Sequence, residues 1–114
     1  MDAIILNRDD LEQDTMSADF QGYRYGDTPV SFIWVDAPPG AGPRLHRHPY
    51  VEVFIVLEGS VTFTVGNDQV AGAAGQVVVV PPNTPHKFIN SGTGPLRQID
   101  IHASDHFITE WLED

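Results

Sequence analysis

From about residue 30 onward the sequence consists of short runs of β-branched and aromatic residues separated by glycine and proline. The longest of these runs are Val30 to Val35, Val51 to Leu57, Ser60 to Val65, Gln76 to Val80 and Leu96 to His102. Short runs with turn residues between them are typical of an antiparallel sandwich or barrel. Because helical periodicity is weak throughout, the pattern predicts an all-β domain.

Several segments have more specific expectations. Residues 37–43 contain three prolines, which lack the N–H that a strand ladder requires, so this segment is predicted to be a loop. Val70 to Ala74 and His86 to Asn90 are predicted to be additional short strands. The four consecutive valines that end at Val80 suit a strand that is buried on both faces.

The two ends of the chain have separate predictions. Residues 1–22 are interpreted as an added edge strand or as an arm that contacts a second copy. Residues 104–114 are predicted to form a short helix, because Ser104 or Asp105 could cap it and Phe107, Ile108, Trp111 and Leu112 would lie on one side. That apolar side is expected to pack on the rest of the domain.

Size and charge exclude several classes of function. With 114 residues the chain is predicted to be one domain, residues 1–114. Sixteen acidic residues against six Lys and Arg give a formal charge of −10, which repels phosphates and anionic lipids, so no nucleic-acid or membrane partner is expected. The absence of cysteine excludes disulfides and thiolate ligands. No signal peptide or membrane span is expected, which favours a cytoplasmic location.

The spacing of three polar residues indicates a metal site. His46 and His48 are one residue apart, so in a strand both imidazoles point to the same face. Glu52 returns to that face if the strand resumes after Pro49. It is the only charged residue in an apolar run, and burial of an unpaired carboxylate is costly unless a cation lies nearby. Each of these residues alone could instead be an ordinary surface or hydrogen-bonded side chain.

The same residues resemble the two sequence motifs of the cupin superfamily. Gly40, His46, His48, Glu52 and Gly59 match the first motif, Gly-x5-His-x-His-x3-Glu-x6-Gly, at every position. Residues 75–90 resemble the second motif, Gly-x5-Pro-x-Gly-x2-His-x3-Asn, through Gly75, Pro81, His86 and Asn90. Asn83 stands where the family has glycine, a mild departure because asparagine tolerates left-handed backbone angles.

The resemblance implies an antiparallel jelly-roll β-barrel of the small, single-domain bacterial cupin type. It maps His46, His48, Glu52 and His86 onto the ligands of one divalent transition metal ion, for which iron, manganese, nickel and zinc are the candidates. Small cupins commonly pair through edge strands, so a homodimer is also expected.

Three further residues are candidates for catalysis. Arg44 is in phase with His46 and His48 and could hold an anionic substrate, or it could form a surface ion pair. Gln98, Asp100 and His102 share one face of the last long strand, which could point inward or outward. If that face points inward, His102 is the candidate general base and Asp100 its orienting partner.

Three functions remain open at this point. The favoured hypothesis is a metal-dependent enzyme that acts on a small polar or carboxylated molecule by dioxygenase, decarboxylase, isomerase or lyase chemistry. The second is a non-catalytic module that binds a metal or a small ligand, since fold does not determine function. The third is a metal-free sugar-related isomerase.

Overall fold

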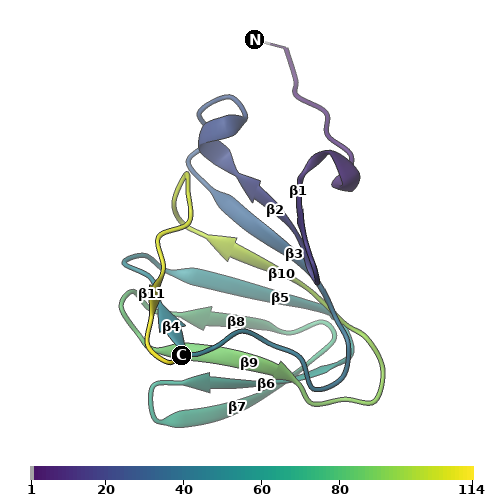
Figure 1. Ribbon diagram of the computed structural model, residues 1–114, viewed down its shortest axis with the longest axis vertical. Coiled ribbons are helices and arrows are strands. Elements are labelled where there is room, and N and C mark those ends of the chain that lie inside the picture. The colour runs from purple at the N-terminus through teal and green to yellow at the C-terminus, as the bar shows by residue number, and fades with distance from the viewer. Residues whose placement is uncertain (1) are drawn as a thin grey trace.

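The structure is a computed structural model that describes residues 2–114, and within this range it contains two antiparallel sheets (Figure 1). Listed in spatial order, the six-stranded sheet consists of β1 (Glu12–Asp14), β2 (Ser17–Gln21), β3 (Ser31–Ala37), β10 (Leu96–His102), β5 (Glu52–Glu58) and β8 (Val77–Val80). The five-stranded sheet consists of β11 (Glu110–Trp111), β4 (His46–Arg47), β9 (His86–Asn90), β6 (Ser60–Val65) and β7 (Asp68–Ala73).

The order of the strands confirms the predicted jelly-roll class. From β3 to β10 the chain passes repeatedly from one sheet to the other, with the hairpin β6–β7 as a local exception. Within residues 2–114 no strand pair joins the two sheets, so the barrel is open along its edges. Two three-residue 3-10 helices, η1 (Arg8–Asp10) and η2 (Gly22–Arg24), are the helical elements of this range. None of its helices has the length and apolar character needed to span a bilayer.

The hydrophobic core lies between the two sheets. Phe54 and Val56 of β5 pack against Phe63 of β6 and Phe88 of β9, and the rings of Phe54 and Phe63 are 4.9 Å apart between centroids. Burial alternates along β5, β6 and β10, as expected for strands with one face on the core. The aromatic core therefore fixes the spacing of the sheets from which the polar site is built.

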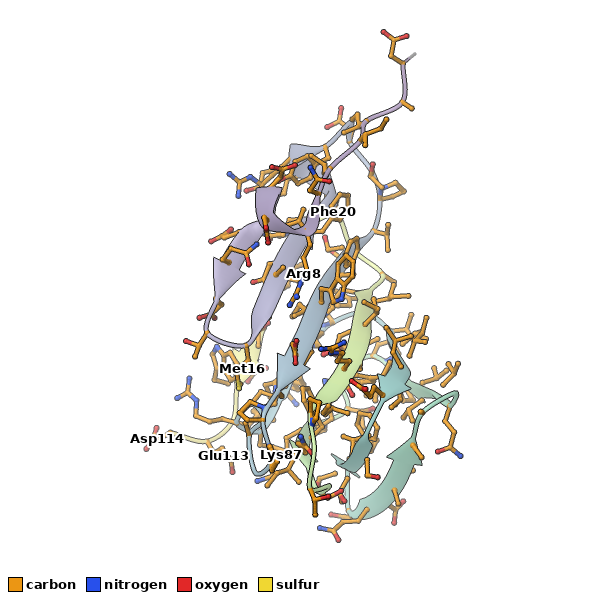
Figure 2. All side chains as sticks on the ribbon, turned by 90° about the vertical axis from the view of Figure 1, so that its right-hand side faces the viewer. Arg8, Met16, Phe20, Lys87, Glu113 and Asp114 are labelled. Carbon is orange, nitrogen blue, oxygen red and sulfur yellow. The ribbon has the colours of Figure 1, made fainter. Side chains whose placement is uncertain are left out.

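The N-terminal residues add a hairpin to the six-stranded sheet. β2 pairs with β3, and β1 forms the outer edge. Residues 2–6 leave the sheet and extend away from it (Figure 1), and Ile5 is 90% exposed. Figure 2 shows Phe20 of β2 in the upper part of the molecule, where its ring stacks on those of Tyr25 and Phe32.

The C-terminal helix predicted over residues 104–114 is wrong. Residues 103–106 are bends and the chain then runs into the short strand β11, whose neighbourhood bonds to another part of the chain: Leu112 N donates to Leu45 O at 2.9 Å, and β11 pairs with β4. Glu113 accepts from Leu45 N and forms an ion pair of 3.1 Å with Lys87, which lies beside it in Figure 2. The apolar residues that suggested a helical side are spread along an extended strap instead.

The prediction that the valine run is buried on both faces is also wrong. β8 is an edge strand that pairs only with β5 in the described range. Val80 is buried, but Val77 and Val79 are 60% and 58% exposed because no further layer covers the outer face of this sheet in residues 2–114.

Candidate metal centre

Four side chains from the two sheets converge in the interior. His46 of β4 lies directly opposite His86 of β9, Glu52 begins β5, and His48 lies in the connection between β4 and β5. One candidate ligand atom from each residue lies within 4.8 Å of the other three. His46 is 8% exposed and the others at most 3%. The structure thus brings together the set that the sequence motifs indicated.

The turn that precedes His86 is attached to the segment that carries His48. Asn83 has a φ of 62°, in the left-handed region, and its N–H donates to His48 O at 2.7 Å. Asparagine therefore fills the position at which the cupin motif has glycine without loss of the backbone geometry.

Backbone carbonyl oxygens determine the tautomer of the three histidines. Nδ1 of His46 lies 2.6 Å from Arg44 O, Nδ1 of His48 lies 2.8 Å from Ile108 O, and Nδ1 of His86 lies 2.8 Å from Thr84 O. A carbonyl oxygen only accepts, so each Nδ1 carries a proton and donates it. In the neutral ring Nε2 then has a free lone pair.

The Nε2 atoms of His48 and His86 lie close to the carboxylate of Glu52, and a cation between them would remove the repulsion between their lone pairs. Glu52 Oε1 lies 2.9 Å from His86 Nε2 and 3.1 Å from His48 Nε2. His48 Nε2 is buried and, in spite of this short distance, has no partner with hydrogen-bond geometry. A divalent ion among these atoms would satisfy every lone pair, and three imidazole nitrogens with one carboxylate oxygen suit iron, manganese, nickel or zinc. The residues therefore fit a transition metal.

The pKa shifts agree with a cation-binding group. Burial lowers the pKa of His46 to about 4, so this ring is neutral at neutral pH. Burial alone would raise the pKa of Glu52, but its contacts with His102, His48 and His86 outweigh burial and hold the pKa well below its usual range. Burial would lower the pKa of His86, but the bond to Glu52 raises it. The Glu52 carboxylate therefore favours positive charge beside the imidazoles, which a bound cation would supply.

His102 of β10 lies beside the four-residue group and contacts the second oxygen of its carboxylate. Its Nε2 is 3.1 Å from Glu52 Oε2, without hydrogen-bond alignment, and its Nδ1 is 2.6 Å from the hydroxyl of Tyr50. Burial raises the pKa of Tyr50 to about 12, so the hydroxyl keeps its proton. Tyr50 therefore fixes the orientation of the His102 ring.

The other sequence-predicted residues occupy different places. Gln98, Asp100 and His102 are all buried, so the face they share points inward. Gln98 Nε2 donates a hydrogen bond to Asp100 Oδ1 at 2.8 Å. The hydroxyl of Tyr50, rather than Asp100, contacts His102 Nδ1. Arg44 lies over the ring of Trp111, 4.7 Å from its centroid, and does not line the cavity beside the metal centre.

Sequence reasoning missed the residues that close the site. Tyr50 lies midway between His48 and Glu52, and its even spacing from both would have indicated the shared face had Pro49 not interrupted the strand pattern. Trp111 packs against His46 and Phe107 against His102, with ring centroids 5.1 and 4.8 Å apart. No local pattern indicates these two contacts, because they depend on the path of the C-terminal strap.

A cavity of about 530 Å³ borders the metal centre. His46, His48, Glu52 and His102 line it on one side, and apolar residues such as Met16, Ile33 and Phe54 line much of the remainder. A volume of this order suits a small molecule.

Comparison with known proteins identifies relatives over most of this region. The family model described as "Cupin domain" matches residues 33–102. The uncharacterized protein MJ1618 of Methanocaldococcus jannaschii is 36% identical over 79 residues, which is 67% of this chain and 63% of that protein. The HTH-type transcriptional regulator PuuR of Escherichia coli is 28% identical over 109 residues, 91% of this chain and 58% of the regulator. The H2HPP isomerase of Bacillus subtilis is 32% identical over 77 residues, 67% of this chain and 32% of the isomerase.

Solved structures show the same fold. Oxalate decarboxylase from Bacillus subtilis superposes with a TM-score of 0.78 and 24% identity over 88% of this chain and 28% of that enzyme. In each of these comparisons the chain spans less than two thirds of the relative's length. The family match covers more than half of the chain and includes all four residues of the histidine–carboxylate group, so the chain belongs to the cupin family.

Proposed function

We propose that this chain is a metal-dependent enzyme that holds one divalent transition metal ion with His46, His48, Glu52 and His86 and acts on a small polar molecule. The observation that carries this proposal is the convergence of imidazole lone pairs on a buried carboxylate beside a cavity of about 530 Å³. The candidate metals are iron, manganese, nickel and zinc. Manganese has support from the structural neighbour oxalate decarboxylase, which has Mn(II) centres.

The chain itself supplies a group that can move a proton. A bound ion of this kind would polarise an oxygen of the substrate. His102 lines the cavity, its Nε2 has no aligned hydrogen-bond partner, and its Nδ1 is held by Tyr50. A ring that is held at one nitrogen and has no aligned partner at the other is suited to general acid–base catalysis. Among the four classes expected from the family, isomerisation and decarboxylation have support from the names of two relatives.

The test begins with protein purified without an affinity tag. Elemental analysis is expected to find about one transition metal per chain, and His46→Ala with His86→Ala is expected to remove it. The metal-loaded protein is then screened for CO₂ release and for exchange of solvent deuterium into small carbonyl compounds. His102→Gln is expected to retain the metal and lose turnover. Turnover that persists after complete removal of the metal would contradict the proposal.

The second candidate is a non-catalytic module that binds a small ligand at the same site. It is favoured by the alignment of 91% of this chain, at 28% identity, with a transcriptional regulator. In that case a ligand bound in the cavity is recovered unchanged, and His102→Gln alters neither its chemistry nor its release. The metal-free sugar-related isomerase has less support, because without a cation the lone pairs of the histidine–carboxylate group oppose one another.

A further inference from the structure

The charged side chains of the cavity wall are of one sign. Asp14, Asp19 and Asp100 line the cavity together with Glu52, and among the described residues no Lys or Arg does so. The two basic residues closest in sequence to the site histidines point elsewhere: Arg47 pairs with Glu110 at 2.7 Å and Lys87 pairs with Glu113. Apart from the metal, the described part of the cavity wall therefore offers an anionic ligand carboxylates and no Lys or Arg partner.

Strand register places two of these carboxylates in one row next to the metal centre. Asp19 of β2 lies opposite Ile33 of β3, which in turn lies opposite Asp100 of β10, so all three point to the same face. Glu52 and His102 are opposite one another in the next inward-facing row. Rows on one face are two residues apart, which is about 7 Å. A ligand of a few atoms can span from one row to the other.

Burial of the carboxyl groups increases from the surface inward. Asp14 is exposed, Asp19 is half-buried and accepts from Ser17 Oγ at 3.0 Å, and Asp100 is 3% exposed. Burial raises the pKa of Asp19, and nearby Asp14 raises it further. Burial and the charge of Glu52 raise the pKa of Asp100 well above its usual range. The row is thus a set of crowded acids that a cation in the cavity would stabilise.

A second feature of the cavity points independently to a ligand. His48 and His102 line the cavity, and the buried Nε2 of each has no partner with hydrogen-bond geometry, although each lies 3.1 Å from an oxygen of Glu52. A buried polar atom without a partner is costly, so polar groups in the cavity are expected to satisfy these nitrogens. The metal accounts for His48, but His102 lies outside the four-residue group and is left for the ligand.

We propose that the cavity binds a small organic cation, a protonated primary amine with a hydroxyl or similar oxygen donor at its other end. The ammonium group lies against Asp19 and Asp100, and the oxygen donor faces the metal centre and His102. This assignment rests on the proposed metal site for the position of the oxygen donor. It differs from the sequence-based expectation that Arg44 could hold an anionic substrate, since Arg44 lies outside the cavity.

The test compares ligands of similar length that carry a cationic, a neutral or an anionic group at one end. Calorimetric titrations of the manganese-loaded protein use 3-aminopropan-1-ol, propane-1,3-diol and 3-hydroxypropanoate, with the homologues of two and four carbons. At the best length the amine is expected to bind about tenfold more tightly than the diol, the increment of one charge-assisted hydrogen bond. The carboxylate is expected to bind most weakly. Tighter binding of the carboxylate, or binding of none of these compounds, would overturn the proposal.

Matched variants locate the effect. Asp19→Asn is expected to abolish the preference for the amine, whereas Asp68→Asn, which removes the same charge from an exposed position outside the cavity, is expected to retain it. If Asp19→Asn fails to fold by circular dichroism, Asp100→Asn takes its place. Equal effects of the cavity and surface variants would contradict the assignment. Metal content is measured on the same samples. If the protein takes up no metal and still prefers the amine, the metal site is refuted while the assignment of the acidic cavity stands.

Discussion

At the scale of single residues, the chemistry of the metal centre depends on three backbone carbonyl oxygens. Arg44 O, Ile108 O and Thr84 O each accept from a histidine Nδ1, and the Nε2 atoms of His48 and His86 lie against Glu52. Ring orientation and tautomer are therefore determined by the backbone before any metal binds. The site is preorganised for a cation, and in the metal-free protein the same arrangement is a source of repulsion.

Replacement of the Glu52 carboxylate by an amide separates its effect on metal binding from its effect on the stability of the metal-free protein. In Glu52→Gln the side-chain NH₂ can donate to His86 Nε2 or His48 Nε2, which lie 2.9 and 3.1 Å from Oε1. We expect the variant to bind metal at least tenfold more weakly while the metal-free protein unfolds at the same temperature or a higher one. Competition with a chelator and thermal unfolding measure the two quantities. Metal affinity equal to that of the unsubstituted protein would refute the role of Glu52 as a ligand.

Asp100→Asn tests the cost of the buried acid. Because the pKa of Asp100 in the folded protein is raised well above 3.8, the folded state holds a proton that the unfolded state releases. Stability of the metal-free protein therefore falls as pH rises above the unfolded pKa, until the folded carboxyl group titrates as well. Asparagine keeps the oxygen that accepts from Gln98 and removes this dependence. We expect the variant to melt about 4 °C higher near pH 8 and to show no such gain near pH 4.

Asp68→Asn is the control for this experiment, since Asp68 is exposed. It is expected to change the melting temperature at either pH by less than Asp100→Asn does at pH 8. A destabilised Asp100→Asn protein at high pH would show that the carboxyl group is ionised and stabilised by a partner.

At the scale of elements, the sequence predicted what is local and missed what depends on neighbours. The short β runs and the spacing of His46, His48 and Glu52 carry a period of two, so strands and shared faces follow from them. The path of residues 104–114 does not follow from the local sequence, because its hydrogen-bond partners are Leu45 and β4, which are distant in the chain. Tertiary hydrogen bonds outweighed a weak helical pattern. The exposure of Val77 and Val79 likewise depends on which strands flank β8.

The C-terminal strap is expected to support the metal centre. Trp111 of β11 lies opposite His46 in the strand register, and their rings are 5.1 Å apart. In Trp111→Ala we expect His46 to be held less firmly and metal affinity to fall about tenfold, which is typical when a group that supports a ligand is removed. Trp34→Ala is a matched control, because Trp34 is also covered by an arginine, Arg8, but lies on β3 outside the cavity lining. Equal losses of metal in both variants would contradict a specific role for the strap.

At the scale of the whole molecule, the outer face of the six-stranded sheet is apolar over several strands. One outward row consists of Val77, Ile55, Ile99 and Trp34, and the neighbouring row consists of Val79, Val53, Ile101 and Phe32. Within residues 2–114 nothing covers Val77 and Val79, although the chain carries a formal charge of −10. Contiguous apolar surface of this kind is characteristic of an interface between protein molecules.

We therefore expect two copies to pack through the outer faces of their six-stranded sheets, rather than only through edge strands. Val77→Lys would place a charge within that interface, and we expect it to weaken dimerisation at least tenfold, as measured by light scattering across a dilution series. Val70→Lys is the matched control, because Val70 is 40% exposed on β7 of the other sheet. A monomeric unsubstituted protein, or dissociation caused equally by both lysines, would show that a different surface or none is used. Metal content should not change in either variant, since neither residue lines the cavity beside the metal centre.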